Sequence, residues 1–314
     1  MNFKILNTIG VAFADEAKKK LEVLGEVTYK IPTQVELEKE IENFDMIVVG
    51  LGLLVNKTVI TNGKNLKVIA TATTGLDHID VSFAEEKGVK VVSLKNDLEF
   101  MKKITGTAEL AWGLLVALAR KIPSSFDSVK EGHWQRENFK GNSLSGKTLG
   151  VLGLGRLGTL VAGYGKAFGM EVLFCDPNVE SLEGTRKVSF EELLKESDCL
   201  SVHVHLTKET ENMISEKEFN QMKNGCFIVN TSRGKIVDED ALLKVLKDKK
   251  VAGYATDVLS DELDFGEQIP ESNPMLQYAK ENTNLIIVPH TGGMTHESRI
   301  LTDIRVVEKI EESL

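Results

Sequence analysis

Short β-branched runs alternate with amphipathic segments along this chain, in two series separated by one long apolar stretch. The first series has five strand candidates, at residues 3–9, 26–31, 45–50, 67–72 and 89–94. Segments with apolar residues at helical spacing lie between most of them. Strand–helix–strand repeats need right-handed crossovers, so the pattern predicts an α/β fold with doubly wound parallel sheets.

The second series has six strand candidates, the number in a complete dinucleotide-binding sheet. They lie at residues 147–155, 171–177, 199–206, 226–232, 251–258 and 284–290. The segment 105–122 between the two series is too apolar to face water on any side, so we expect it between layers or domains. We predict one domain from residues 1–97 and 288–314, and a second from residues 98–287.

The composition limits the partners of the protein. The net charge is −9, and no basic stripe with interleaved aromatic residues is present, which excludes nucleic acid as an expected partner. No apolar run reaches the length of about 18 residues that a membrane helix needs, and the N-terminus does not resemble a signal peptide. The three cysteines lie in apolar runs without metal or redox spacing, which predicts free thiols and a cytoplasmic protein.

Gly153, Gly155 and Gly158 form a GxGxxG motif between a predicted strand and an apolar helix. In a dinucleotide-binding fold the first glycine allows the tight turn, the second lets the backbone approach the pyrophosphate, and the third lets the helix pack on the strand. The helix N-terminus then offers free N–H groups to the phosphates. The motif alone is weak, and a glycine turn without a ligand is the alternative interpretation.

Asp176 ends the next predicted strand, 18 residues after Gly158, which is close to the spacing of about 20 residues in dinucleotide-binding folds. Its carboxylate can accept hydrogen bonds from both ribose hydroxyls of the adenosine and would repel a 2′-phosphate. Pro177 and Asn178 follow, with no adjacent arginine. The sequence therefore predicts NAD rather than NADP, with Arg186 as the one nearby cation that argues against this choice.

Three further strand ends carry residues of chemical interest. Arg233 follows one buried strand, Asp257 and then Glu262 follow the next, and His290 follows the last. Ligands of open α/β sheets bind beyond the carboxyl ends of the strands, so these residues are expected to converge. Taken singly, Arg233 could cap a helix, Glu262 could be a surface acid and His290 a polar residue at a strand end. Together they match hydride-transfer chemistry.

The ordered motifs of the whole chain resemble those of the NAD-dependent D-specific 2-hydroxyacid dehydrogenases. The motifs that carry the resemblance lie at residues 73–80, 107–120, 150–158, 230–242, 255–262 and 289–293. The resemblance implies a flavodoxin-like substrate domain built from both ends of the chain, with a Rossmann NAD-binding domain inserted between them. It also implies oxidation or reduction of a small D-2-hydroxy or 2-keto acid, and a homodimer with residues 107–120 at or near the interface.

The same resemblance assigns roles to residues. His290 would be the general acid/base and Glu262 its hydrogen-bond partner, while Arg233 would hold the substrate carboxylate together with backbone N–H groups around Thr74 and Gly75. Asp257 and the backbone of Thr231 would orient the nicotinamide amide. The predicted cofactor-binding residues are Gly153, Gly155, Arg156, Leu157, Gly158, Asp176, His205, Thr231, Arg233, Asp257 and His290. No metal is expected, because the pair His203 and His205 lacks a third ligand at useful spacing.

The sequence departs from the family pattern at three places. His205 stands where members often have proline. Five residues more than expected separate Glu262 from His290. The segment 94–106 is longer and more basic than usual. We predict that at least one of Lys95, Lys102 and Lys103 meets a second anionic group on the substrate, either a phosphate, as on 3-phosphoglycerate, or a second carboxylate. The alternative is that these lysines are solvated loop charges.

Three related functions are weighed against this one. Formate dehydrogenases of the same fold carry glutamine beside the histidine, and Glu262 argues against that chemistry. Phosphite-oxidising relatives carry a lysine in the turn at residues 73–77, where this chain has none. The alternative from a different class is an NAD(H)-sensing co-regulator of the C-terminal-binding protein type, which shares the fold and the three catalytic residues. Such proteins act through flanking tails, for which this chain has little room, so an enzyme is expected.

Overall fold

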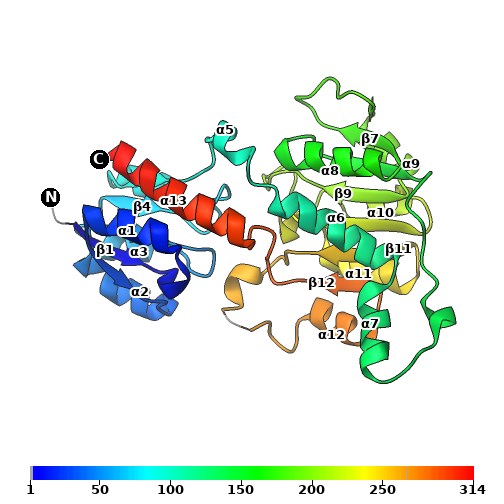
Figure 1. The fold of residues 1–314 in the computed structure, drawn as a ribbon, viewed down its shortest axis with the longest axis horizontal. Coiled ribbons are helices and arrows are strands. Elements are labelled where there is room, and N and C mark those ends of the chain that lie inside the picture. The colour runs from blue at the N-terminus through cyan, green and yellow to red at the C-terminus, as the bar shows by residue number, and fades with distance from the viewer. Residues whose placement is uncertain (1–2, 267) are drawn as a thin grey trace. The chain divides into compact units, whose positions relative to one another are not determined.

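A computed structural model describes residues 3–266 and 268–314, which form two compact units (Figure 1). One unit contains the N-terminal residues up to Ile104 together with Met294–Leu314, and the other is Thr105–Gly293. The second unit is thus inserted into the first. The sequence pattern predicted these boundaries after residue 97 and before residue 288. Both positions lie a few residues before the junctions between the two compact units.

Local packing explains the later junctions. Met101 and Ile104 are buried with Leu94 in a small apolar cluster, so the chain belongs to the first unit until Ile104. At the second junction the amide of His290 donates to the carbonyl of Asp257 at 3.0 Å, which holds the end of the inserted segment to its own sheet. Neither contact has a signature in the hydrophobic pattern.

The first unit is built on a parallel sheet with the strand order β2-β1-β3-β4-β5, the flavodoxin-like order. Its strands are β1 (Phe3–Asn7), β2 (Gly25–Tyr29), β3 (Met46–Val48), β4 (Val68–Ala70) and β5 (Lys90–Val92). Its helices are α1 (Asp15–Leu24), α2 (Gln34–Glu40), α3 (Lys57–Asn62), α4 (Val81–Glu86), α5 (Leu98–Met101) and α13 (His296–Ser313).

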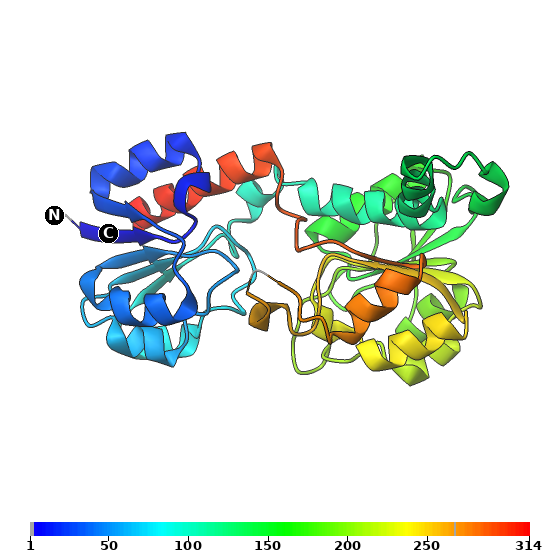
Figure 2. The same ribbon diagram turned by 90° about the horizontal axis from the view of Figure 1, so that it is seen from below.

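Helices cover both faces of this sheet (Figure 2). Leu21 of α1 and Val307 of α13 are buried in the core on one face, and Leu37 of α2 and Val59 of α3 are buried in the core on the other. The sheet is therefore doubly wound, which requires strands that are apolar on both sides. Ile5, Leu6 and Ile47 are fully buried for this reason.

The inserted unit is built on a second parallel sheet, with the order β12-β11-β10-β9-β6-β7-β8. Its strands are β6 (Thr148–Leu152), β7 (Glu171–Cys175), β8 (Arg186–Lys187), β9 (Cys199–Val202), β10 (Cys226–Asn230), β11 (Val251–Thr256) and β12 (Leu285–Ile287). Its helices are α6 (Gly106–Ala119), α7 (Ile122–Lys130), α8 (Arg156–Ala167), α9 (Phe190–Glu196), α10 (Glu216–Gln221), α11 (Glu239–Lys247) and α12 (Pro274–Glu281).

The predicted fold class is confirmed, with one strand added. The pattern predicted six strands in the second series, and the sheet has a seventh, β8, which pairs with β7 through only two residues. Arg186 and Lys187 are both charged and exposed at the edge of the sheet. A strand this short and polar shows no alternation from which it could be predicted.

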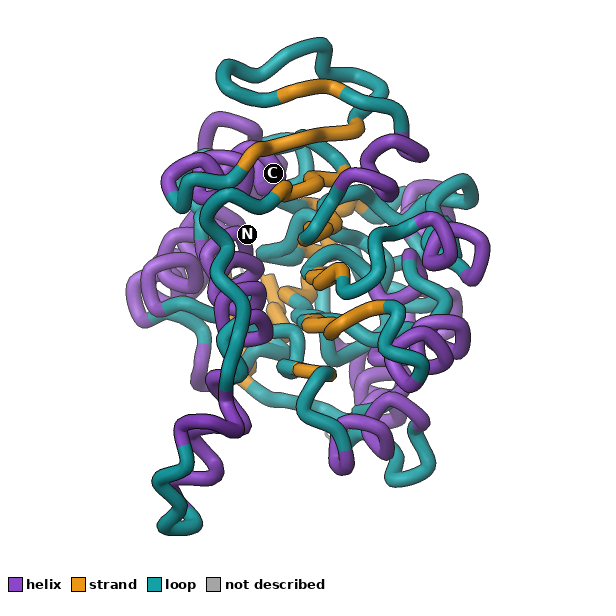
Figure 3. Tube along the Cα trace, turned by 90° about the vertical axis from the view of Figure 1, so that its right-hand side faces the viewer, coloured by secondary structure: helices purple, strands orange, loops and turns teal. Residues whose placement is uncertain are grey.

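Helices lie on both sides of the strands (Figure 3). Residues of α6 and α8 share the core on one face of the second sheet, and residues of α9 to α12 share the core on the other. The apolar character of α6 arises from this position, because Ala111, Leu115 and Ala119 are buried in the core that it shares with α8. Helix α7 follows and has no buried residue. None of the helices within the described residues has the length and apolar character that spanning a membrane requires.

Candidate active site

The glycine loop leaves the carboxyl end of β6, where the strand order of the second sheet reverses between β6 and β9. Gly153 has φ of +89°, which L-residues rarely adopt. A Cβ at Gly153 would lie 2.7 Å from the carbonyl oxygen of His203 at the end of β9. Only glycine therefore allows the two strand ends to approach each other here.

Gly155 and Gly158 have different functions in the loop. Gly155 precedes α8 as its N-cap, without a side-chain capping bond, and no atom lies within 4 Å of the place where its Cβ would be. A Cβ at Gly158 would lie 2.1 Å from the carbonyl oxygen of Gly153, so this glycine allows the helix to pack against the loop. The open space at Gly155 and the N-terminus of α8 form a cradle for an anion.

Asp176 follows β7 and connects the glycine loop to the next turn. Its Oδ2 accepts a hydrogen bond from the amide of Leu154 at 2.8 Å, and its Oδ1 accepts from the amides of Asn178 and Val179 at 2.7 and 3.1 Å. The carboxylate thus lies beside the glycine loop, where the ribose of a dinucleotide would bind. Its function in fixing the loop itself was not foreseen from the sequence.

Arg186, the one nearby cation that could favour NADP, is already paired with acidic side chains. Arg186 forms ion pairs with Glu196 and Glu171. His203 contributes no charge either, because burial lowers its pKa to about 4, and its Nε2 lies 2.8 Å from the hydroxyl of Ser201. These contacts agree with the choice of NAD made from Asp176.

Arg233 lies in the turn between β10 and the 3-10 helix Gly234–Ile236. Asn230 fixes the turn, because its Nδ2 donates to the carbonyl of Arg233 at 2.9 Å and its Oδ1 accepts from the amide of Ser232. Nη1 of Arg233 donates to the carbonyl of Ser232 at 2.7 Å. The guanidinium is therefore held at the carboxyl edge of the sheet.

Glu262 and His290 meet at the same edge, past the ends of β11 and β12. Nδ1 of His290 lies 2.9 Å from Oε1 of Glu262, and both side chains are mostly buried. Asp257, just past the end of β11, is only 1% exposed. Burial raises the pKa of its carboxyl group, and the hydrogen bonds that it accepts from backbone N–H groups oppose that rise.

Asp257 shapes the turn that carries His290. Its Oδ1 accepts from the amide of Thr291 at 2.6 Å, and its Oδ2 accepts from the amide of Gly292 at 2.8 Å. A Cβ at Gly292 would lie 2.8 Å from the same Oδ2, so the turn needs glycine. The structure thus adds a positioning contact to the nicotinamide contact that the sequence predicted for Asp257.

A dinucleotide fits these residues on the evidence of the structure itself. The cradle at Gly155 suits the pyrophosphate, and Asp176 suits the ribose. The hydroxyl of Thr231 is buried and has no hydrogen-bond partner among the described residues, and such groups normally have one. Leu157 and Arg156 are the first residues of α8, and His205 follows β9 with its side chain exposed.

The remaining predicted residues belong to the first unit. Thr74 and Gly75 lie in the turn after β4, where the hydroxyl of Thr73 donates to the carbonyl of Gly75 at 2.7 Å. Lys102 is exposed after α5, and its Nζ lies 2.6 Å from Oε1 of Glu99. Lys103 is exposed as well.

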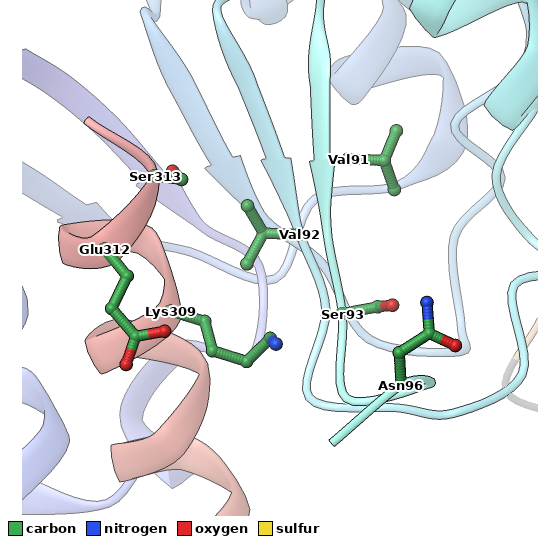
Figure 4. A pocket seen from close by; sticks show the side chains of 7 residues that line it. All are labelled: Val91, Val92, Ser93, Asn96, Lys309, Glu312 and Ser313. Atoms are coloured by element: carbon green, nitrogen blue, oxygen red, sulfur yellow. The ribbon is translucent and has the colours of Figure 1, made fainter. Parts of the chain in front are cut away.

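A hollow of about 320 Å³ in the first unit lies along the edge strand β5 and the end of α13 (Figure 4). Its lining includes Val92, Ser93, Asn96 and Lys309. It contains none of the predicted site residues. Within the described residues no group of three or more potential metal ligands is present.

Comparison with known proteins identifies the class to which this fold and site belong. The NAD-binding domain of the D-isomer specific 2-hydroxyacid dehydrogenases matches residues 112–292. The chain belongs to this family of NAD-dependent oxidoreductases, which act on the CH–OH group of 2-hydroxy acids. The family predicted from the sequence, and NAD as its cofactor, are thus confirmed.

Individual relatives cover the chain to different extents. It is 39% identical to a D-3-phosphoglycerate dehydrogenase of Methanocaldococcus jannaschii over 96% of this chain and 56% of that protein. It is 38% identical to a hydroxypyruvate reductase of Thermotoga maritima over 95% of this chain and 92% of the relative. The chain thus spans little more than half of the first relative and nearly all of the second.

A solved structure agrees with these comparisons. The D-lactate dehydrogenase of Aquifex aeolicus, in complex with NAD and lactic acid, is 28% identical to this chain and superimposes with a TM-score of 0.81. The superposition covers 99% of this chain and 95% of that one. These relatives are dehydrogenases and reductases, which favours an enzyme over the co-regulator considered from the sequence.

Proposed function

We propose that this chain reduces a small 2-keto acid to the D-2-hydroxy acid with NADH, and catalyses the reverse reaction with NAD. The observation that carries this proposal is the 2.9 Å contact between Nδ1 of His290 and Oε1 of Glu262. A carboxylate on one ring nitrogen selects the tautomer and fixes the orientation of the ring. The other nitrogen, Nε2, is then the atom that exchanges a proton with the substrate oxygen.

Arg233 binds the substrate carboxylate and polarises its carbonyl group. The planar guanidinium offers two parallel donors, a geometry that lysine does not provide. The contribution of Thr74 and Gly75 to carboxylate binding stays a prediction from the sequence. Bound NADH supplies the hydride, so the residues of the chain orient the substrate, hold its charge and deliver the proton.

The substrate class is a short 2-keto acid of the hydroxypyruvate type. The relative named hydroxypyruvate reductase matches this chain over nearly the whole of both proteins. A second candidate is the phosphorylated acid of the 3-phosphoglycerate dehydrogenases, because Lys102 and Lys103 lie together on the first unit. A panel of glyoxylate, pyruvate, hydroxypyruvate and 3-phosphohydroxypyruvate, followed by loss of NADH absorbance, tests both. If the protein turns over none of these four keto acids, the proposal is wrong.

We also propose that the protein forms a homodimer through α7. Ile122, Phe126 and Val129 lie on one side of α7 at helical spacing and are 47%, 62% and 49% exposed, and Trp134 beyond the helix is 87% exposed. Exposed apolar patches of this kind mark interaction surfaces. The sequence predicted an interface at or near residues 107–120. Much of α6 is buried in its own unit, so within that region we propose the exposed side of α7 as the contact surface.

The protein is assigned to the cytoplasm. Its three cysteines, Cys175, Cys199 and Cys226, are all free. Free thiols in apolar surroundings are typical of a reducing compartment. Fractionation of cells that express the full-length protein would test this assignment.

A further inference from the structure

Glu239, the first residue of α11, lies next to the segment that carries Glu262. Its Oε1 accepts a hydrogen bond from the amide of Ser260 at 2.8 Å. Burial raises the pKa of the Glu239 carboxyl group, and the N–H of Ser260 opposes this rise. A carboxylate at the first turn of a helix ordinarily faces water and stabilises the helix dipole. Glu239 instead bonds to a different strand end.

The segment from Leu259 to Glu262 is also held from a second side. A Cβ at Gly234 would lie 2.1 Å from the carbonyl carbon of Leu259 and 2.3 Å from the amide nitrogen of Ser260. Gly234 therefore allows the two backbones to touch directly. Arg233 immediately precedes this contact, so one short stretch of chain carries Arg233 and supports the segment of Glu262.

The supported segment ends at the carboxylate that meets His290. The amide of Leu259 lies 3.4 Å from Oε2 of Glu262, and Oε1 of the same carboxylate lies 2.9 Å from Nδ1 of His290. A shift of the backbone at Ser260 would move Glu262, because only Asp261 separates them. Misplacement of a reacting group by about 1 Å can lower a rate by about 100-fold.

We propose that Glu239 is a positioning residue that fixes Glu262 for its hydrogen bond to His290. This inference rests on the proposed function, in which the pair of Glu262 and His290 delivers the proton. Glu239 acts through the acceptor oxygen that it presents to Ser260, and its charge is secondary. The structure thereby assigns a function to an acid outside the group that contacts substrate or cofactor.

Three variants separate the hydrogen bond from the charge. Glu239→Ala removes the acceptor, and we expect kcat for keto-acid reduction to fall about tenfold with little change in the KM for NADH. Glu239→Asp keeps the charge but is shorter, so kcat should also fall. Glu239→Gln keeps an acceptor oxygen and should remain within about threefold of wild type. Equal losses in the Gln and Ala variants would overturn the proposal.

Asp240 offers a matched control. It is exposed in the same first turn of α11, so Asp240→Ala removes an equivalent charge from the helix N-terminus without touching Ser260. We expect its kcat to match wild type. If Glu239→Ala and Asp240→Ala lower kcat equally, the effect arises from the helix and the positioning function is wrong.

The double variant Glu239→Ala/Glu262→Gln tests whether Glu239 acts through Glu262. If it does, the double variant should have the kcat of Glu262→Gln alone, whereas a separate structural function would lower kcat further. Failure of the proposed function is recognised independently, because Glu262→Gln would then retain wild-type kcat. If Glu239→Ala does not fold in a thermal melt, the Asp and Gln variants carry the same comparison.

Discussion

Nδ1 of His290 lies 2.9 Å from Oε1 of Glu262, although 28 positions separate the two residues in the sequence. His290 has φ of +49°, in the left-handed region that non-glycine residues rarely occupy. Such a backbone costs on the order of 1 kcal/mol or more, and it persists where the surroundings fix it. Here the backbone of Asp257 bonds to the amide of His290, and its carboxylate bonds to the next two amides.

We first predict that His290→Ala or Arg233→Ala lowers turnover by orders of magnitude and leaves NADH binding largely intact. A positioned acid/base contributes about 10²–10⁴-fold to the rate, and neither side chain contributes to the glycine loop that holds the phosphates. Steady-state kinetics and titration of NADH fluorescence measure the two effects. Turnover close to wild type in either variant would exclude the proposed mechanism.

Asp176→Ser is expected to raise the ratio of NADPH to NADH efficiency, because it removes the charge that opposes a 2′-phosphate. The carboxylate also accepts hydrogen bonds from the amides of Leu154, Asn178 and Val179. Because the variant loses these bonds and the loop loosens, the KM for both cofactors should rise. Comparison of kcat/KM for the two cofactors in wild type and variant measures this change. A wild-type preference for NADPH would contradict the assignment.

Much of the architecture could be predicted because it depends on local patterns. Alternating β-branched runs and helical spacing identify most of the strands, and parallel strands bring their carboxyl ends to one edge of a sheet. That rule alone places Arg233, Glu262 and His290 at a common edge. The two-residue strand at Arg186 and Lys187 has no such pattern, and it was missed.

Other features depend on contacts between loops, which leave no trace in a linear pattern. From the sequence Glu239 is an ordinary acid in a first helical turn, and only the structure shows that it reaches Ser260. The apolar sequence of helix α6 does not show whether the helix is covered by its own sheet or by a second copy of the protein. The buried residues of each helix, which the sequence pattern does not give, favour α7 as the contact surface of the proposed dimer.

Asp303 of α13 gives the first unit a distinctive dependence of stability on pH. Burial raises its pKa from 3.8 to about 6, although the amide of Ala14 and the guanidinium of Arg299 both contact it. Because the pKa is higher in the folded state, this group favours folding most below about pH 4. That contribution is lost as the pH rises through about 6.

Asp303→Asn removes this titration, so the difference in free energy of unfolding between wild type and variant should fall as the pH rises from about 4 to about 7. A pKa difference of about two pH units corresponds to about 3 kcal/mol. Urea unfolding of both proteins at several pH values measures the difference. A difference that stays constant across this range would show that Asp303 does not titrate as described.

Phe126→Glu should convert the proposed dimer to a monomer, because it places a charge in the centre of the apolar side of α7. Light scattering at micromolar concentration measures the mass. Val23→Glu is the matched control, since Val23 is an exposed apolar residue on α1, 81% exposed, and its replacement should leave the dimer intact. A wild-type monomer, or a dimer that survives Phe126→Glu, would contradict the interface.

The last prediction concerns the second anionic group of the substrate. Lys102 pairs with Glu99 at 2.6 Å, and both side chains are more than half exposed. A surface ion pair of this kind contributes only about 0–1 kcal/mol, so an incoming phosphate could displace Glu99 at little cost. Lys103, the adjacent residue, offers a second positive charge.

Replacement of Lys102 and Lys103 with methionine keeps the length of both side chains and removes their charge. If the lysines meet a phosphate or a second carboxylate, the KM for 3-phosphohydroxypyruvate should rise by about tenfold, because a charge-assisted hydrogen bond contributes about 1.5–3 kcal/mol. The KM for glyoxylate or pyruvate should change much less. Steady-state kinetics with saturating NADH compares the two substrate classes. Equal changes for both classes, or a wild-type preference for uncharged side chains, would show that both lysines serve only as solvated surface charges.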